Sequence, residues 1–187
     1  MESKLILFNR IMSTIDEMKS EDVESFSETI QKRVLTMEEY RTALRVGLYS
    51  AFKNEVRTDL LFSEGDVRRK EMYYPAVDEG AGSLSYFRIT KLEQLIASNI
   101  GIKEPTIKQS RLRDLSTLNA IIVPGVAFDL HGGRLGYGKG FYDKCLSTFS
   151  GKRIALAYDF QIVSELPTAV RGRKLDWIVT EKRIIRC

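Results

Sequence analysis

Glycine is concentrated in one short segment of this chain, and that segment constrains the fold more than any other feature. The sequence has 187 residues and 13 glycines, none of which precedes Gly47. Six of them fall between positions 125 and 140, namely Gly125, Gly132, Gly133, Gly136, Gly138 and Gly140. The apolar run 120–123 precedes this cluster and a helix-like segment, 141–149, follows it. The pattern predicts a buried strand, a loop with an exposed backbone and then a helix.

The rest of the chain predicts an α/β fold that begins with helices. Apolar residues recur every three or four positions over residues 5–18 and 23–34, as they do in amphipathic helices. Thr36 and Glu39 have the spacing of a capping box, which predicts a short third helix. Further on, strand-like runs alternate with helix-like segments. The expected strands are 45–51, 71–77, 84–90, 119–124, 153–159 and 176–180, and the expected helices are 58–70, 91–99 and 141–149.

The run Ala-Ile-Ile-Val at 120–123 indicates how these elements are layered. It is apolar on both faces, which is typical of a central, mostly parallel strand that is covered on each side. We therefore expect a single three-layer α/β/α domain over residues 1–187, with a mostly parallel central sheet and an N-terminal helical segment.

Composition excludes several classes of protein. Hydrophobic residues make up 43% of the chain and charged residues 29%, which argues against disorder and supports a sizeable core. Two cysteines and a single histidine, His131, exclude cysteine-rich and multi-histidine metal sites. No run of about 18 apolar residues and no signal-peptide pattern is present, so we expect a cytoplasmic protein without a membrane partner.

The net charge of +4 arises near the C-terminus. Residues 151–187 hold eight Lys and Arg against four Asp and Glu, while the rest of the chain is balanced. Such an excess suits an anionic ligand or a nucleic acid. No RNA-binding motif or interleaved aromatic pattern accompanies it, so we do not expect a nucleic-acid partner.

The glycine cluster resembles a phosphate-binding loop without matching either of two familiar patterns. Residues 133–140 fit G-x-x-x-x-G-K, but Gly140 stands where a P-loop has Ser or Thr, and the spacing also misses the dinucleotide fingerprint by one residue. Arg134 and Lys139 supply counter-charges for phosphate, and Asp143 offers a carboxylate for Mg²⁺. The alternative interpretation is a structural turn whose following helix favours an acidic residue in its first turn.

The same residues carry a resemblance to a known family. Residues 124–143 read Pro-Gly-x-x-Phe-Asp-x-x-Gly-x-Arg-Leu-Gly-x-Gly-x-Gly-Phe-Tyr-Asp. This pattern is similar to the signature of the 5-formyltetrahydrofolate cyclo-ligases, also called 5,10-methenyltetrahydrofolate synthetases. Weaker similarities lie at Glu55-x-x-Thr58, at 101–105 and at 175–181, so the resemblance extends over nearly the whole chain.

The resemblance implies an enzyme that uses ATP and Mg²⁺ to close 5-formyltetrahydrofolate into 5,10-methenyltetrahydrofolate, releasing ADP and phosphate. Its partners would be these two small molecules, and we expect a monomer, with a dimer as the alternative. A second hypothesis is a paralogue of the same fold that binds folate or nucleotide without closing the ring.

The resemblance also implies roles for individual residues. Those expected to bind ATP are Lys4, Arg134, Leu135, Gly136, Tyr137, Gly138, Lys139, Gly140, Phe141 and Tyr142. Those expected to bind the folate are Ser50, Glu55, Tyr137, Phe141 and Tyr142. Catalytic roles fall to Glu55, Arg134 and Lys139, and Asp143 is expected to hold Mg²⁺.

Two departures from the family pattern support the second hypothesis. Phe8 stands where the family has an Arg, one helical turn after Lys4. Near the last strand, Val170-Arg171-Gly172 replaces an acidic residue and a His-Asp pair. Both changes remove polar groups that the family places near its ligands.

Overall fold

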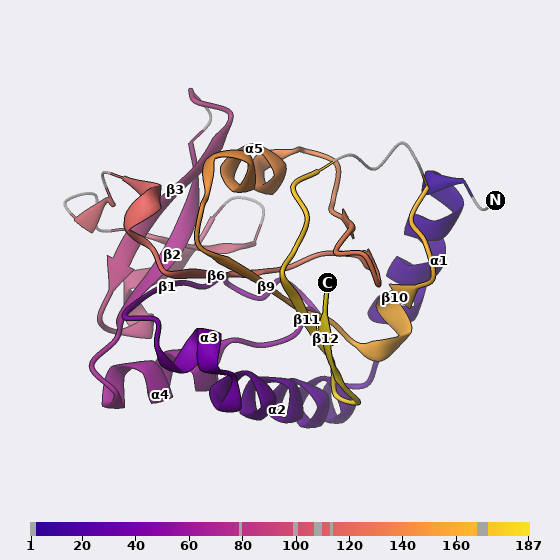
Figure 1. Ribbon diagram of the computed structural model, residues 1–187, viewed down its shortest axis with the longest axis horizontal. Coiled ribbons are helices and arrows are strands. Elements are labelled where there is room, and N and C mark those ends of the chain that lie inside the picture. The colour runs from indigo at the N-terminus through magenta and orange to yellow at the C-terminus, as the bar shows by residue number, and fades with distance from the viewer. Residues whose placement is uncertain (1–2, 79, 99–100, 107–109, 113, 168–171) are drawn as a thin grey trace.

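A seven-stranded, mostly parallel sheet lies at the centre of the protein (Figure 1). The computed structural model describes residues 3–78, 80–98, 101–106, 110–112, 114–167 and 172–187. The order of strands is β12-β11-β9-β6-β1-β2-β3. Their bounds are β1 (Arg45–Gly47), β2 (Glu71–Asp78), β3 (Ser83–Ile89), β6 (Ala120–Val123), β9 (Lys152–Leu156), β11 (Trp177–Val179) and β12 (Ile184–Arg186). Only the two edge strands, β3 and β12, pair antiparallel, so the predicted mostly parallel sheet is confirmed.

Helices cover both faces of this sheet. The first face is covered by α2 (Ser20–Thr36), α3 (Glu38–Arg41) and α4 (Asp59–Val67), and the opposite face by α5 (Phe141–Thr148) (Figure 1). Ile122 packs into the core beneath α2, α3 and α4, whereas Ile121 and Val123 pack into the core beneath α5. The central strand is thus buried on both sides, as its apolar sequence predicts.

The first helix, α1 (Lys4–Asp16), packs against a smaller sheet instead of the central one. That sheet has the order β10-β7-β8 and comprises β7 (Ala127–Asp129), β8 (Arg134–Leu135) and β10 (Ile162–Val163). Leu7, Ile11 and Ile15 of α1 share a core with Leu135 and its neighbours. Because β7 and β8 lie within the glycine-rich segment 125–140, α1 packs against that segment.

One predicted helix, 91–99, is wrong. Its described part forms a short 3-10 turn, η1 (Leu92–Gln94), followed by β4 (Leu95–Ala97), which pairs with β5 (Lys103–Pro105). The side-chain oxygen of Gln94 accepts the backbone N–H groups of Thr90 and Lys91. This local side-chain contact competes with helical hydrogen bonding and favours a turn.

The capping box expected at Thr36 is also wrong. The Thr36 hydroxyl donates to the carbonyl of Arg33 inside the last turn of α2. The following helix begins at Glu38 without a side-chain cap. In addition, β1 ends at Gly47 where the sequence predicted a strand to 51, and the short strands β7, β8 and β10 were not predicted.

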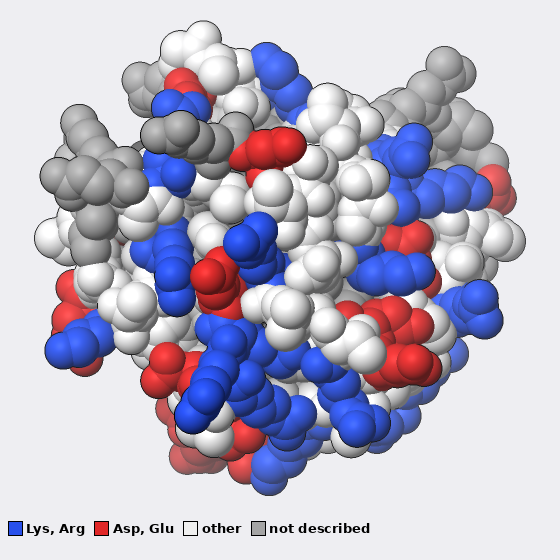
Figure 2. Space-filling view, turned by 60° about the vertical axis from the view of Figure 1, so that its left-hand side comes forward, with Lys and Arg blue, Asp and Glu red and all other residues white. Residues whose placement is uncertain are grey.

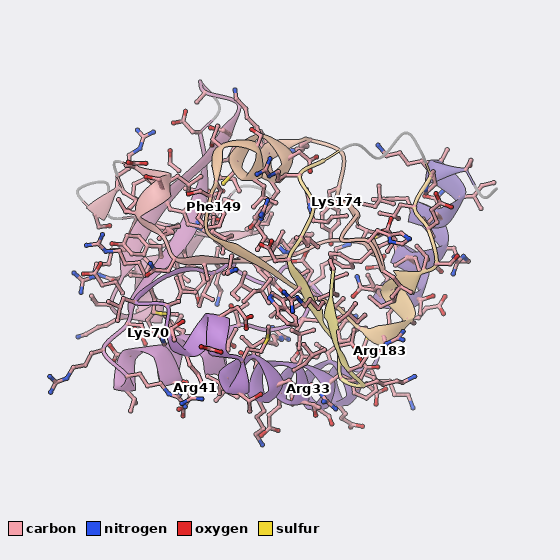
Figure 3. All side chains as sticks on the ribbon, in the orientation of Figure 1. Arg33, Arg41, Lys70, Phe149, Lys174 and Arg183 are labelled. Atoms are coloured by element: carbon pink, nitrogen blue, oxygen red, sulfur yellow. The ribbon has the colours of Figure 1, made fainter. Side chains whose placement is uncertain are left out.

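Lys70, which lies between α4 and β2, closes the end of α3 (Figure 3). Its side chain is buried, and Nζ donates to the carbonyls of Tyr40 at 2.8 Å and Arg41 at 2.9 Å, and also to that of Ala43. The ammonium group also lies 5.1 Å from the centre of the Tyr40 ring. A single cation therefore satisfies the backbone carbonyls at the C-terminal end of α3.

Replacing this cation tests its contribution. Lys70→Met leaves buried carbonyls without a donor, so we expect the free energy of unfolding in urea to fall by roughly 2 to 3 kcal/mol. Lys32→Met is the control, because Lys32 forms an exposed ion pair with Glu28 and such pairs contribute little. Equal stability of the two variants would contradict this role.

Candidate active site

Glu55 lies in the loop that follows β1 and is only 9% exposed. Its Oε2 accepts the backbone N–H of Phe52 at 2.9 Å. Burial raises the pKa of Glu55 to about 7, although the hydrogen bond from the Phe52 N–H and the nearby Tyr137 hydroxyl limit the increase. Near neutral pH, the carboxyl group can therefore either accept or release a proton.

Hydrogen bonds anchor the loop that carries this carboxyl group. The Tyr49 hydroxyl donates to the carbonyl of Val56 at 2.6 Å, and the Tyr158 hydroxyl donates to the carbonyl of Asn54 at 2.9 Å. The Asn54 amide donates in turn to the carbonyl of Ile15, in the last turn of α1, at 2.9 Å. These contacts fix the loop between the sheet and α1.

A narrow cavity of about 10 Å³ adjoins Glu55, enough for about one water molecule. It is lined by Ile15, Tyr49, Glu55, Val56, Pro124, Gly125, Leu156, Tyr158 and Gln161. Gln161 was not singled out from the sequence, yet its Nε2 donates to the carbonyls of Gly125 at 2.9 Å and Val126 at 3.0 Å. It thereby holds the start of the glycine-rich segment, and a lone buried glutamine carries no sequence signal for such a role.

Arg134, in β8, and Asp143, in α5, form an ion pair beside the glycine-rich loop, residues 136–140. Arg134 Nη2 lies 2.5 Å from Asp143 Oδ1; the Arg134 side chain is 6% exposed and that of Asp143 46%. Arg134 Nε is buried and has no hydrogen-bond partner among the described residues. A Cβ at Gly136 would lie 2.6 Å from Arg134 Nη1, so any other residue here would displace the guanidinium group from this position.

The loop between Gly136 and α5 presents its backbone to open space. Gly138 and Gly140 have φ angles of +94° and +72°, and nothing lies within 4 Å of a Cβ built at either position. Glycine is therefore required by backbone conformation. Lys139, between them, is exposed, and Gly140 caps the N-terminus of α5. An open backbone loop that leads into a helix N-terminus suits an anion.

Tyr142, in the first turn of α5, lies between Arg134 and the two cores. Its ring centre lies 5.5 Å from the Arg134 guanidinium carbon, and the side chain packs against both hydrophobic cores. Burial, reinforced by the negative charge of Glu55, raises the pKa of the Tyr142 hydroxyl well above its ordinary value. The hydroxyl therefore stays protonated and is available as a hydrogen-bond donor at neutral pH.

The other residues predicted to bind ligands lie in varied environments. The hydroxyl of Ser50 is buried and has no hydrogen-bond partner within the described part of the chain. Phe141 is half-buried at the start of α5, and Lys4 is exposed in the first turn of α1. The Leu135 side chain is buried in the core beneath α1, so only its backbone is available to a ligand.

Asp143 is the carboxylate that the structure offers for a metal ion at this loop. No group of three or more His, Cys, Asp or Glu side chains that could hold a metal occurs among the described residues. Mg²⁺ bound to substrate phosphates needs only one or two protein carboxylates. The half-exposed Asp143 suits Mg²⁺ that is bound mainly by phosphate oxygens. The described residues offer no metal site built from protein ligands alone.

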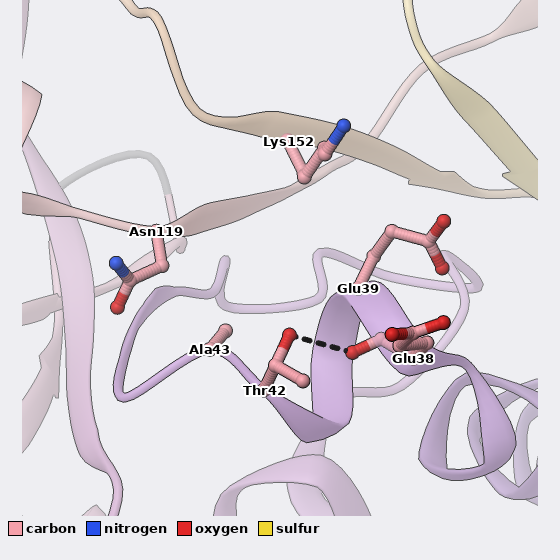
Figure 4. A pocket seen from close by; sticks show the side chains of 6 residues that line it. All are labelled: Glu38, Glu39, Thr42, Ala43, Asn119 and Lys152. Carbon is pink, nitrogen blue, oxygen red and sulfur yellow. Dashed lines mark hydrogen bonds between the residues drawn. The ribbon is translucent and has the colours of Figure 1, made fainter.

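Two further surfaces lie outside this site. A wider pocket of about 370 Å³ lies at the opposite edge of the sheet, where β6 and β9 begin, and is lined by Glu38, Glu39, Thr42, Ala43, Asn119 and Lys152 (Figure 4). The basic C-terminal segment is partly neutralised within the fold, since Arg153 pairs with Asp176 and Arg183 with Asp159. Basic and acidic side chains are likewise interspersed on the face shown in Figure 2.

Of the three residues that depart from the family pattern near the last strand, the structure describes one. Val170 and Arg171 lie outside the described residues, and Gly172 lies beside Asp143.

The raised pKa of Glu55 predicts a stability that depends on pH. The folded protein keeps this proton up to about pH 7, whereas the unfolded chain loses it near 4.5. Stability is therefore lost as pH rises between these values, by about 3 kcal/mol in total. The stability of Glu55→Gln relative to the unmutated protein should increase by that amount between pH 4.5 and 8 in urea unfolding.

Glu24→Gln, on the exposed side of α2, is the matched control and should show no comparable increase. If the stability difference for Glu55→Gln stayed constant across this pH range, the proposed burial of an ionisable carboxyl group would be wrong.

Comparison with known proteins agrees with the family signature. The model of the 5-formyltetrahydrofolate cyclo-ligase family matches residues 1–181. The chain is 32% identical to the probable 5-formyltetrahydrofolate cyclo-ligase of Schizosaccharomyces pombe, over 93% of each chain. It is 30% identical to the 5-formyltetrahydrofolate cyclo-ligase of Escherichia coli K12, over 81% of this chain and 86% of the other.

A solved structure shows the same fold. The NMR structure of Aquifex aeolicus 5,10-methenyltetrahydrofolate synthetase superimposes with a TM-score of 0.86 and 32% identity, covering 98% of this chain and 92% of the other. The family match over nearly the whole chain and this structural agreement lead to one conclusion: the protein belongs to the 5-formyltetrahydrofolate cyclo-ligase family.

Proposed function

We propose that the protein converts 5-formyltetrahydrofolate to 5,10-methenyltetrahydrofolate with ATP, releasing ADP and phosphate. The observation that carries this proposal is the position of Tyr142, whose ring lies against the Arg134 guanidinium group and whose hydroxyl is within range of the negative charge of Glu55. This position supports a single site that combines a phosphate-binding loop with a proton-transferring carboxyl group. Family membership supplies the substrate class.

The reaction requires little covalent participation by the protein. The formyl oxygen is a poor leaving group until it receives the γ-phosphoryl group of ATP, which forms an O–P bond and releases ADP. N10 of the folate then attacks the formyl carbon, loses its proton, and phosphate departs with the former formyl oxygen. The protein has to position the reactants, balance phosphate charge and accept a proton.

Charge balance falls to the glycine-rich loop. Arg134 and Lys139, with the exposed Lys4, are the cations proposed to contact the ATP phosphates, and the loop backbone from Leu135 to Tyr142 is proposed to contact the nucleotide. Asp143 is proposed to hold Mg²⁺, which when bound neutralises phosphate charge. The unpaired Nε of Arg134 supports this assignment, because a buried donor without a partner is costly unless a ligand satisfies it.

Glu55 is proposed to face the reacting formyl group and to accept the N10 proton, a role that suits a pKa of about 7. The buried, unpaired hydroxyl of Ser50 and the side chains of Tyr137, Phe141 and Tyr142 are proposed to contact the folate. The cavity beside Glu55 holds about one water molecule. Folate binding is therefore proposed to displace side chains at this edge of the sheet.

A paralogue that binds these ligands without closing the ring is the second candidate. Two departures from the family pattern favour it. Phe8 places an apolar ring beside Tyr137 where the family has an Arg. Gly172 brings no polar side chain, although a Cβ there would lie 3.0 Å from Asp143 Oδ1. Introducing Phe8→Arg discriminates between the two. Turnover that appears only in this variant would support the paralogue, and turnover by the unmutated protein excludes it.

The setting of the reaction is also a proposal. We expect a monomer in the cytoplasm that takes two small soluble substrates and no nucleic acid. Among the described helices, none is both long and apolar enough to span a bilayer.

The lysine of the loop provides a direct test. Lys139→Ala removes a charge proposed to contact ATP but not folate, so the KM for ATP should rise roughly ten- to hundredfold with little change for the folate. The assay follows the absorbance of the methenyl product in the presence of ATP and Mg²⁺.

Lys152→Ala is the control, because this lysine lines the pocket at the opposite edge of the sheet. Equal effects of the two substitutions would contradict the assignment of the loop. No turnover by the unmutated protein at high enzyme concentration would refute the proposed activity itself.

A further inference from the structure

Phe8 of α1 contacts Tyr137 of the glycine-rich loop edge to face. The two ring centres are 6.3 Å apart and the ring planes meet at 82°. Aromatic pairs prefer this T-shaped arrangement because the positive edge of one ring meets the negative face of the other. The contact joins two segments that are far apart in the sequence.

Tyr137 is partly exposed but has a buried end. About 45% of its surface is accessible, yet the hydroxyl lies close enough to Glu55 to interact with the carboxyl group. Burial and the charge of Glu55 both raise the pKa of Tyr137 well above its ordinary value. The phenol is therefore protonated at neutral pH and is able to donate to the carboxylate.

The helix that presents Phe8 is held in place independently of this contact. Leu7 and Ile11 pack into a core shared with Val126 and Leu135. At the other end of α1, the carbonyl of Ile15 accepts a hydrogen bond from the Asn54 amide, which directly precedes Glu55 in the chain. Phe8 is thus carried by an anchored helix that touches the Glu55 loop at one end and the glycine-rich loop at the other.

We propose that Phe8 is a positioning residue, whose ring holds Tyr137 so that the phenol hydroxyl donates to the Glu55 carboxyl group. No substrate contact is proposed for Phe8, which acts through Tyr137. The consequence for catalysis rests on the proposed function, since Glu55 is the proposed proton acceptor. The positioning itself can be measured without any turnover.

The remaining groups that face this carboxyl group do not change charge near neutral pH. The backbone N–H of Phe52 donates to it. Burial raises the pKa values of the surrounding phenols, those of Tyr49, Tyr142 and Tyr158, so they stay neutral. The negative charge of Asp16, in α1, raises the pKa of Tyr137 and so favours the protonated phenol. The proposed hydrogen bond from Tyr137 is therefore the contact that a substitution at position 8 would alter.

The test is an NMR titration of the Glu55 carboxyl carbon in ¹³C-glutamate-labelled protein, with the signal assigned by its loss in Glu55→Gln. A donor to the charged form lowers the pKa of a carboxyl group, so removing it raises the titration midpoint. Tyr137→Phe should raise the midpoint by about 0.5 to 1 pH unit, the equivalent of one hydrogen bond.

Phe8→Leu keeps an apolar side chain but removes the ring, and should shift the midpoint in the same direction as Tyr137→Phe. Phe8→Tyr keeps the aromatic contact and should leave the midpoint unchanged. Met12→Leu is the matched control, because Met12 packs on the same core one turn later in α1, and should also leave it unchanged. If the enzyme turns over, the acidic limb of its pH profile should follow these midpoints.

Either of two results would overturn the proposal. One is an unchanged midpoint in Phe8→Leu when Tyr137→Phe shifts it, which would show that Tyr137 does not depend on Phe8. The other is an unchanged midpoint in Tyr137→Phe, which would show that the phenol does not donate to Glu55. Neither result bears on whether the protein is a cyclo-ligase, and absence of turnover would leave the titration readable.

Discussion

The parallel pairing of β1 with β6 is the constraint on which the candidate site depends. Gly47 pairs with Ile121, so the two strands end at the same edge of the sheet. A Cβ at Gly47 would lie 2.8 Å from the ring of Tyr86, which reaches over β2 from β3 in the same sheet, so this ring position requires glycine at 47. The loop with Glu55 follows β1, and the glycine-rich segment follows β6. In an open α/β sheet, ligands bind at this edge.

The electrostatics at this edge of the sheet depend on the ion pair between Arg134 and Asp143, whose two members are buried to very different extents. Arg134 is almost fully buried, whereas its partner Asp143 is about half exposed. Nη2 donates to Asp143 and Nη1 to the Pro124 carbonyl at 3.3 Å, but the Arg134 Nε has no partner within the described chain. A buried charge needs several partners to offset its desolvation. The ion pair therefore keeps the guanidinium group in place and leaves its Nε available to bind a larger anion.

The sequence predicted the parts of the fold that depend on local pattern. The apolar run 120–123 identified the central strand, and the glycine cluster placed Arg134 and Asp143 on either side of one loop. The N-terminal periodicity predicted α1 and α2. These features depend on residues that are neighbours along the chain, and the family signature lies in the same stretch.

Features that depend on tertiary contacts could not be predicted in this way. The segment 91–97 has helical periodicity, but a Gln94 side-chain contact and pairing with β5 produce a turn and a strand. Gln161 and the contact between Phe8 and Tyr137 join segments that are distant in the sequence. Phe8 first indicated a lost polar group, and only the structure shows the ring contact that it forms. The roles of Lys4, Ser50 and the other ligand-binding residues stay predictions.

The central claim is that phosphoryl transfer activates the formyl oxygen at this edge of the sheet. The most direct measurement uses 5-formyltetrahydrofolate labelled with a heavy oxygen isotope in the formyl group, with ATP and Mg²⁺, and determines the isotope content of the released phosphate by mass spectrometry. We predict that each phosphate carries one labelled oxygen, because the formyl oxygen leaves attached to phosphorus. Unlabelled phosphate formed together with the methenyl product would contradict the account.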